Sequence, residues 1–319
     1  MPPSGTEPAA AAAPPSAPPG GLPGAVVFSV LAAALAWAAA SPLWLGGQGL
    51  EHPQNRLFIQ VMMATPAAAA IIVLSASGGR RGLLRTTGVL PLRPLRPLLG
   101  YCLAGLVLSP LIMGGGILLA ALAGGYRPDL TDFSAFREFA EPLGLASAEG
   151  SGVPLGALGA LLGLQSLGLL AGLPMFLGEE LGWRGYLLPA LMPLGTWPAL
   201  LVHGAVWGVW HAPVILLGYN FGRTDLAGVG LMTVWCVLFG LVLGLLRLAS
   251  GSVWPAVLCH GALNSSTMMV VVFGDADAGL VGSDALPLGV WIGACTVIAA
   301  LIAVGALALR ARPASAAGR

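Results

Sequence analysis

Stretches of about twenty mostly apolar residues alternate with short polar segments along most of the chain. A helix needs roughly 20 predominantly apolar residues to cross a bilayer. The pattern therefore predicts an all-α, polytopic membrane protein with about eight transmembrane helices. The fourth stretch is long enough that it must tilt, kink at Pro174 or consist of two pieces. The expected spans are residues 24–45, 57–77, 98–123, 157–188, 198–219, 227–247, 253–273 and 287–309.

Composition agrees with this fold class and narrows the partners. Of the 319 residues, 57% are hydrophobic and 8% are charged, whereas soluble domains carry about 25% charged residues. The lipid bilayer is thus the first expected partner. Nucleic acid is not an expected partner, because no basic face with interleaved aromatic residues is present. The four cysteines lie in apolar runs and none pairs as C-x-x-C, so neither a disulfide framework nor a zinc knuckle is predicted.

The same pattern divides the chain into five parts. The first is Pro/Ala-rich and too poor in large apolar residues to bury a core, so we expect a disordered tail. The parts are the tail (1–23), N-terminal transmembrane helices (24–123), an extracytoplasmic loop (124–156), a core that carries the unusual polar residues (157–273), and a C-terminal helix with its tail (274–319).

Charge placement predicts the orientation. Arginines cluster in the linker 78–97 and in the C-terminal tail, and eight spans place both segments on the same side of the membrane. Ten of the thirteen acidic residues fall on the opposite side. Basic loops are typically cytoplasmic, so both termini are predicted to be cytoplasmic. All fourteen basic residues are arginine, which is typical of a GC-rich genome and favours a bacterial plasma membrane.

The long outer loop contains a short aromatic repeat. Phe133, Phe136 and Phe139 recur every three residues. This spacing indicates an interfacial helix. A lid over a site is the alternative, because long loops in compact domains are often functional.

Three charged residues are expected well inside the spans, all in "EELGWR". Charge within a span costs about 2.5–3.5 kcal/mol on insertion scales and usually marks function. Glu180 and Arg184 are four residues apart on one helix face and are expected to pair. Glu179 points about 100° away, and an unpaired carboxylate removed from water is a usable general base. The alternative is a hydrated ion-pair cluster at the cytoplasmic edge.

Three histidines and an asparagine are also expected within the membrane. In "HGAVWGVWHAP", Pro213 should break the helix beside His211, and a broken helix at membrane depth usually lines a cavity or other protein. His203 is expected to make an interhelical hydrogen bond. In "CHGALNSS", His260 and Asn264 share a helix face and could donate to an oxyanion or simply join helices. We expect a common polar chamber in the middle-to-cytoplasmic half.

Together these motifs resemble the CPBP family of intramembrane proteases, which includes the Ras-converting CAAX prenyl endopeptidases and bacterial Abi proteins. The family pattern is E-E-x-x-x-R, then an aromatic residue with x-x-x-H, then H-x-x-x-N. Order and spacing fit over about 157–273, and Trp207 stands where Phe is commoner. The matching residues are Glu179, Glu180, Arg184, Trp207, His211, His260 and Asn264.

The resemblance implies a CAAX-protease-like helical core that hydrolyses peptide bonds of membrane-anchored peptides or proteins. Glu179, helped by His211, would activate water, and His260 with Asn264 would stabilise the oxyanion. Glu180 and Arg184 would give structural support, with Trp207 as a wall of the site. No cofactor is expected. If a zinc ion took part, its ligands would be Glu179, His211 and His260.

Two other functions fit the same residues. A proton-coupled transporter could use Glu179, His211 and His260 as a relay, although no inverted repeat is visible in the sequence. A catalytically silent scaffold, for example a bacteriocin-immunity protein, is the other alternative.

Overall fold

The computed structural model describes residues 17–282 and 285–310, and every regular element in these residues is a helix. Seven helical segments are long and apolar enough to cross a membrane, which confirms an all-α polytopic membrane protein. They are Gly21–Leu45 (α1), Asn55–Ala76 (α2), Leu95–Leu122 (α4), Leu155–Leu194 (α6 to η5), Leu226–Ser250 (α10), Trp254–Val272 (α11, Trp254–Ser266, with α12) and Leu288–Gly305 within α13 (Leu288–Arg310).

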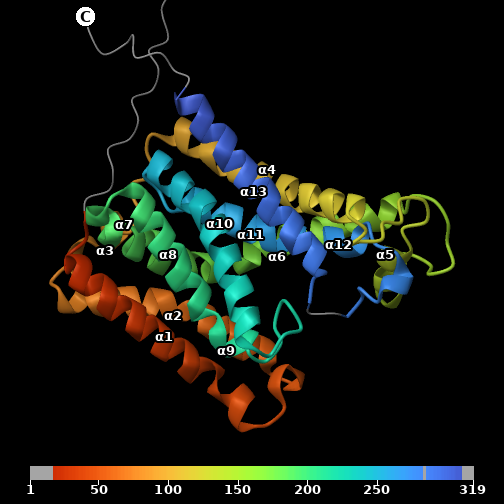
Figure 1. Cartoon of the computed structure of the whole chain (residues 1–319), viewed down its shortest axis with the longest axis horizontal. Coiled ribbons are helices and arrows are strands. Elements are labelled where there is room, and N and C mark those ends of the chain that lie inside the picture. Colours follow the sequence, from red (N-terminus) through yellow and green to blue (C-terminus); the bar gives the residue numbers. More distant parts are fainter. Residues whose placement is uncertain (1–16, 283–284, 311–319) are drawn as a thin grey trace, which may run out of the picture.

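The fifth expected span, residues 198–219, is broken beside His211, as predicted from Pro213. Helix α8 (Thr196–Trp210) ends before His211, and α9 (Ala212–Ile215) follows at once. Pro213 explains the break, because its ring nitrogen has no hydrogen for the helical ladder. Neither piece has the length of a membrane span. Helix α8, although shorter than a span, still crosses the bundle; α1 begins at the left of Figure 1 and α13 ends at its upper left.

The fourth expected span is a single long helical segment that changes its winding. Helix α6 (Leu155–Glu180) contains Pro174 and continues as a π-helix, η4 (Leu181–Leu187), then as α7 (Leu188–Leu191) and η5 (Met192–Leu194). A π-turn inside a helix is rare and frequently occurs at functional sites. Here it begins directly after the two adjacent glutamates.

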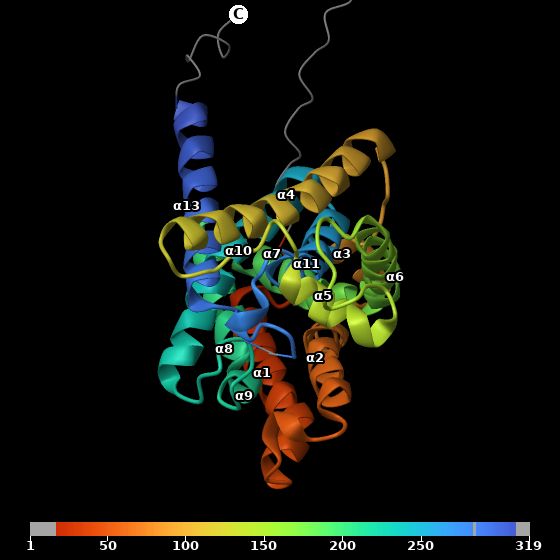
Figure 2. The ribbon, with the colours of Figure 1, turned by 90° about the vertical axis from the view of Figure 1, so that its right-hand side faces the viewer.

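The helices pack as a bundle with two outer pairs. Helices α1 and α2 lie side by side on one flank, and α4 crosses α13 on the opposite flank (Figures 1 and 2). Helices α8, α10 and α11 lie between these pairs, and α6 contacts both α2 and α11. The bundle therefore places the ends of α6, α8 and α11, which carry the unusual polar residues, in its interior.

Glycines allow several of these helices to approach closely. The Cβ of an alanine at Gly116 of α4 would lie 2.7 Å from a backbone atom of α13, and one at Gly208 of α8 would lie 2.4 Å from the backbone of Thr233 in α10. Small residues at helix crossings are how membrane helices gain packing contacts. The core of the bundle thus depends on backbone proximity as well as on large side chains.

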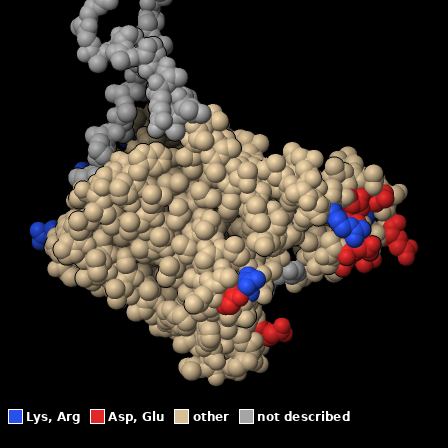
Figure 3. All heavy atoms as spheres, in the orientation of Figure 1, with Lys and Arg blue, Asp and Glu red and all other residues tan. Residues whose placement is uncertain are grey.

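The loop between α4 and α6 forms a small core of its own. Helix α5 (Ser134–Ala140) packs Phe133 and Phe136 against the first turns of α6 and against Val272. The buried Arg137 guanidinium donates to the carbonyls of Asp132, Ser147, Ser151 and Gly152. Charged atoms gather over this end of the molecule, at the right of Figure 3. The loop is therefore an ordered, polar-faced unit held by one arginine.

Asp129 organises the turn that leads into α5. Its carboxylate accepts hydrogen bonds from the backbone N–H groups of Asp132, Ser134 and Thr131. These bonds, that from Asp132 first, hold the pKa of Asp129 below its usual range. The carboxylate is thus stabilised in its charged form and satisfies backbone groups that the loop leaves without helical partners.

Two expectations about the ends of the spans need correction. Helix α1 begins at Gly21, inside the segment expected to be a tail, while residues 1–16 and 311–319 of the expected tails lie outside the described residues. Arg247, in the last turn of α10, is 2% exposed and is a fourth buried charge within the spans. The remaining short elements are η1 (Gly49–Glu51), η2 (Arg80–Gly82), α3 (Leu83–Thr86), η3 (Glu141–Leu143), α12 (Met269–Val272) and η6 (Ala276–Ala278).

Candidate active site

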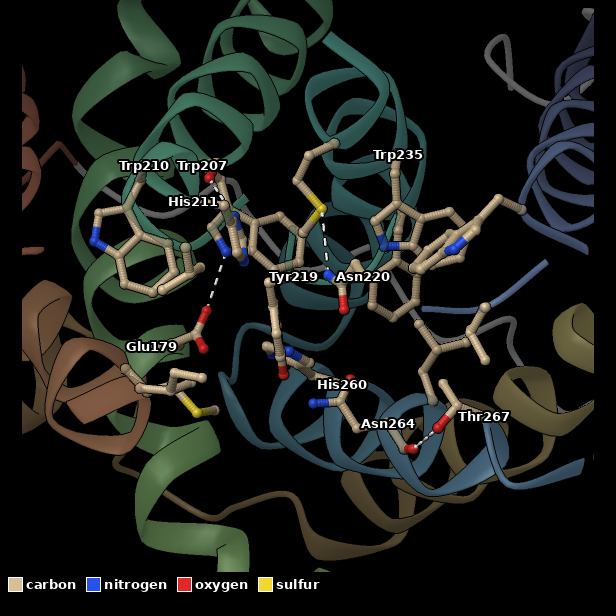
Figure 4. A pocket seen from close by; sticks show the side chains of 18 of the residues that line it. Glu179, Trp207, Trp210, His211, Tyr219, Asn220, Trp235, His260, Asn264 and Thr267 are labelled. Atoms are coloured by element: carbon tan, nitrogen blue, oxygen red, sulfur yellow. Dashed lines mark hydrogen bonds between the residues drawn. The ribbon is translucent and has the colours of Figure 1, made fainter. Parts of the chain in front are cut away.

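The polar residues of all three motifs line one cavity of about 350 Å³ (Figure 4). Glu179 comes from the end of α6, His211 from the end of α8, and His260 and Asn264 from α11. Three helices that are distant in sequence therefore bring a carboxylate, two imidazoles and an amide to the same space. The other walls are mostly apolar and include Ile59, Met62, Met63, Met113, Trp207, Trp210, Val214, Tyr219, Asn220, Met232, Trp235, Phe239, Leu263, Thr267, Leu286 and Trp291.

The cavity lies nearer to the side opposite the arginine-rich linker, which corrects the expected depth. Its walls include Ile59 in the first turns of α2, Thr267 just after α11, and Leu286 just before α13. The start of α2, the end of α11 and the start of α13 all lie on the side of the bundle that carries the loops 211–225 and 267–287.

Glu179 is buried and has one hydrogen-bond partner. Its side chain is 3% exposed, and its Oε2 accepts a hydrogen bond of 3.0 Å from the indole Nε1–H of Trp207. Within the described residues, no protein group donates to Oε1. The prediction that Glu179 has no partner on its own helix is therefore correct, and the partner across the interface was missed.

Glu180 is the centre of a second, fully buried polar group. Its Oε1 lies 2.9 Å from Arg184 Nη1 and 2.9 Å from His260 Nδ1, and neither Glu180 nor Arg184 is exposed. The predicted ion pair is confirmed, and the alternative of a hydrated cluster is wrong. The contact with His260 was not predicted. It turns Nδ1 of the imidazole toward Glu180, so that Nε2 is the nitrogen left for the cavity.

His211 is oriented by the break in its helix. Its Nδ1 lies 2.9 Å from the backbone carbonyl oxygen of Trp207, which it reaches as a donor, and Cys236 Sγ lies 3.8 Å from the same nitrogen. Donation from Nδ1 leaves Nε2 as an acceptor in the neutral ring. The break in the helix before Pro213 thus fixes which edge of the His211 ring faces the cavity.

Trp207 does more than form a wall. Besides its bond to Glu179, its ring lies 4.0 Å below the guanidinium carbon of Arg184, and its centroid is 5.5 Å from that of His260. A cation over an indole face is attracted by the ring quadrupole. One side chain therefore contacts both the Glu179 and the Glu180 groups.

His203 and Asn264 differ in their placement. His203 is fully buried beside Gly240, does not line the cavity, and gains no interhelical hydrogen bond among the described residues, contrary to expectation. Asn264 is exposed and follows His260 by one helical turn, on the same wall of the cavity (Figure 4). Asn264 thus belongs to the site and His203 to the packing of α8 against α10.

Two polar wall residues were not predicted. Tyr219 and Asn220 follow α9 in a loop that a bridge between Asn220 and Ala285 ties to the segment before α13. Asn220 has φ +67°, and its Nδ2 contacts the sulfur of Met232 at 3.8 Å. A polar pair between two glycine residues in "GYNFG" was the only signal for them. By contrast, no residue of the 124–154 loop lines the cavity, so the structure gives no support to a lid at this position.

The structure shows no ready-made metal centre. Within residues 17–282 and 285–310, no group of three or more His, Cys, Asp or Glu side chains is placed to hold a metal ion. The Nδ1 atoms of His211 and His260 face the Trp207 carbonyl and Glu180, so only their Nε2 atoms are left toward the cavity. A zinc site formed by Glu179, His211 and His260 stays a prediction.

The segment that carries these residues was compared with known proteins. No curated protein matches the chain. Residues 160–266 match the family model described as type II CAAX prenyl endopeptidase Rce1-like, a segment that contains all seven motif residues. The core of the chain, residues 160–266, is therefore similar to the Rce1-like family of CAAX prenyl endopeptidases.

Proposed function

We propose that the chain hydrolyses peptide bonds of membrane-anchored peptides or proteins with a water molecule activated by Glu179. The observation that carries this proposal is the placement of Glu179 in the cavity. Its Oε2 is held by Trp207, Oε1 has no donor among the described residues, and the two imidazoles and Asn264 line the same space. A buried carboxylate with one free oxygen is suited to accept a proton from water.

The residues divide into two roles. Glu179 Oε1 takes a proton from water, and His211 Nε2 helps to orient that water as its oxygen attacks the peptide carbonyl carbon. His260 and Asn264 then donate hydrogen bonds to the oxyanion. Nδ1 of His260 faces Glu180, so Nε2 is the ring nitrogen that would donate to the oxyanion. When the tetrahedral intermediate collapses, the C–N bond breaks and the proton on Glu179 passes to the leaving amine.

The substrate class follows from the family name and from the cavity walls. The matching family is named for CAAX prenyl endopeptidases, whose substrates end in a prenylated cysteine followed by three residues. Methionine and tryptophan side chains dominate the apolar walls here. Such walls suit a peptide that carries a lipid chain or lies in the bilayer, and a farnesylated CAAX peptide is the first substrate to test.

The test compares wild type with Glu179→Gln and His211→Ala. Each purified protein is incubated with a farnesylated CAAX peptide and with a membrane-peptide library, and products are identified by mass spectrometry. We expect cleavage by wild type and a loss of at least about 100-fold in both variants, the typical contribution of acid–base catalysis. Glu138→Gln, which changes an exposed carboxylate outside the cavity, serves as the matched control.

The same proteins discriminate the other functions. Proton-dependent solute flux in proteoliposomes that Glu179→Gln abolishes, without peptide cleavage by wild type, would replace the protease with a transporter. Wild-type cleavage that survives in Glu179→Gln would remove Glu179 from the mechanism. Absence of both activities, with an intact phenotype in both variants, would indicate a silent scaffold.

A further inference from the structure

Trp207 contacts Glu179, Arg184 and His211. Its indole Nε1–H donates to Glu179 Oε2 at 3.0 Å, its ring lies under Arg184, and its backbone carbonyl accepts from His211 Nδ1. The side chains of Trp207 and Glu179 are 2% and 3% exposed. The hydrogen bond between them is therefore shielded from water, where an N–H donor to a carboxylate acts strongly.

We infer that Trp207 is a positioning residue that binds one oxygen of Glu179 and so presents the other to the water in the cavity. This inference rests on the proposed function, because it assigns the geometry of the same carboxylate. An aromatic residue is expected at this position in the family, commonly Phe. A phenyl ring could form the same wall and the same contact with Arg184, but it has no hydrogen to donate to Glu179.

The contact constrains the carboxylate in two ways. A single donor on Oε2 fixes the rotation of the carboxylate plane, since the rest of the side chain is packed among buried residues. It also stabilises the charged form of Glu179, because a hydrogen bond to a carboxylate favours its ionised state. Arg184, which lies over the indole ring, adds positive potential on the same side. The contact with Trp207 thus orients the Glu179 carboxylate and favours its charged form over what burial alone would allow.

The side chain and the backbone of Trp207 serve different partners. The indole holds Glu179, whereas the carbonyl oxygen holds His211. A change of side chain at this position therefore removes the donor to Glu179 and leaves the backbone acceptor of His211 in place. Trp207→Phe is the variant that isolates the donor.

The experiment measures kcat, KM and their pH dependence with the farnesylated CAAX peptide. For Trp207→Phe we expect kcat to fall about 10- to 100-fold, the range for one hydrogen bond to a charged group, with KM within about 2-fold of wild type. The acid limb of the kcat profile should move to higher pH, because the carboxylate has lost a donor to its charged form. A purely structural role would lower the amount of active protein without moving this limb.

The control is Trp254→Phe, which removes the indole donor to the Val89 carbonyl outside the cavity. It tests the loss of an indole hydrogen bond as such, and its pH profile should match wild type. If Trp207→Phe folds poorly, Trp207→His is the second variant to measure. Its imidazole again carries a ring N–H, and we expect it to recover part of the lost kcat.

Two outcomes keep the inference and the proposed function apart. If Glu179→Gln is inactive but Trp207→Phe keeps the wild-type kcat and pH profile, the inference is overturned and the proposed function stands. If Glu179→Gln still cleaves the peptide, the proposed function fails and the inference fails with it. A lower kcat in Trp207→Phe with an unmoved acid limb and no recovery in Trp207→His would also overturn the inference.

Discussion

At the scale of single residues, the two adjacent glutamates have different surroundings and therefore different tasks. Glu179 contacts one neutral donor, whereas Glu180 carries Arg184 and His260 on the same oxygen, with none of these groups well exposed to solvent. Removing one partner of a buried ion pair costs about 3–5 kcal/mol, because the other charge is left without compensation. Glu180 is thus expected to be needed for the fold and Glu179 for the chemistry.

Glu180→Gln should destabilise the protein, while Glu179→Gln should not. The amide keeps the size of the side chain but leaves the buried Arg184 without its counter-charge, and we expect the free energy of unfolding to fall by about 3 kcal/mol or more. Thermal unfolding in detergent, followed by the fluorescence of the nine tryptophans, measures this. Equal melting temperatures for the two variants would contradict the division of roles.

The contacts between residues on the same helix could be predicted from the sequence. The Glu180–Arg184 pair was predictable because four residues of helix bring the two side chains together. The His260 contact joins residues 80 positions apart, and no local periodicity reports which ring nitrogen will face which helix. The hydrogen bond from the Trp207 indole to Glu179 could not be predicted for the same reason, since an aromatic residue in an apolar run indicates only a wall of the site.

At the scale of elements, the π-helix η4 brings the segment after the glutamates against α2. The Cβ of an alanine at Gly182 would lie 2.5 Å from Pro66 Cβ and 2.6 Å from its backbone carbon, so the contact is with main chain that cannot yield easily. At Gly163, earlier in the same helical segment, the Cβ of an alanine would meet no atom within 4 Å, so this position is open. Both belong to Gly-x-x-x-Gly pairs, and only the structure separates the pair that packs from the pair that does not.

Gly182→Ala should lower stability, while Gly163→Ala should leave it unchanged or raise it. Overpacking of a tight contact typically costs about 1–3 kcal/mol, whereas Gly to Ala in an open helix position gains up to about 1 kcal/mol in helix propensity. The melting temperatures of the two variants in the same detergent test this. A Gly182→Ala protein as stable as wild type would show that α2 can move away from η4 at little cost.

At the scale of the whole molecule, the hydrophobic pattern predicted the helical class and the approximate position of most spans. It did not predict how deep the cavity lies, because depth depends on where each helix starts relative to its neighbours. Nor did it predict that residues outside the matched core, among them Met62, Met113 and Trp291, complete the cavity walls. Helices that carry no motif thus shape the space into which a substrate would fit.

The orientation of the bundle remains a prediction from its charges. Arginines should hold the 78–97 linker in the cytoplasm, which places α5 outside. A membrane-impermeant maleimide applied to intact cells should label Glu138→Cys and should label Arg85→Cys only after lysis, both positions being exposed. Cys102, Cys236 and Cys259 are buried and Cys295 is half-buried, so the unsubstituted protein gives the background. The reverse labelling pattern would invert the topology.

The short helix α8 has a consequence for hydration. Its 15 residues rise only about 22 Å at 1.5 Å per residue, against a hydrocarbon core of about 30 Å. A segment shorter than the membrane is accommodated by local thinning of the lipid or by polar groups reaching inward. The break at His211 would then bring the aqueous phase close to the Glu179 carboxylate. The water that hydrolysis consumes would reach the site along this short helix.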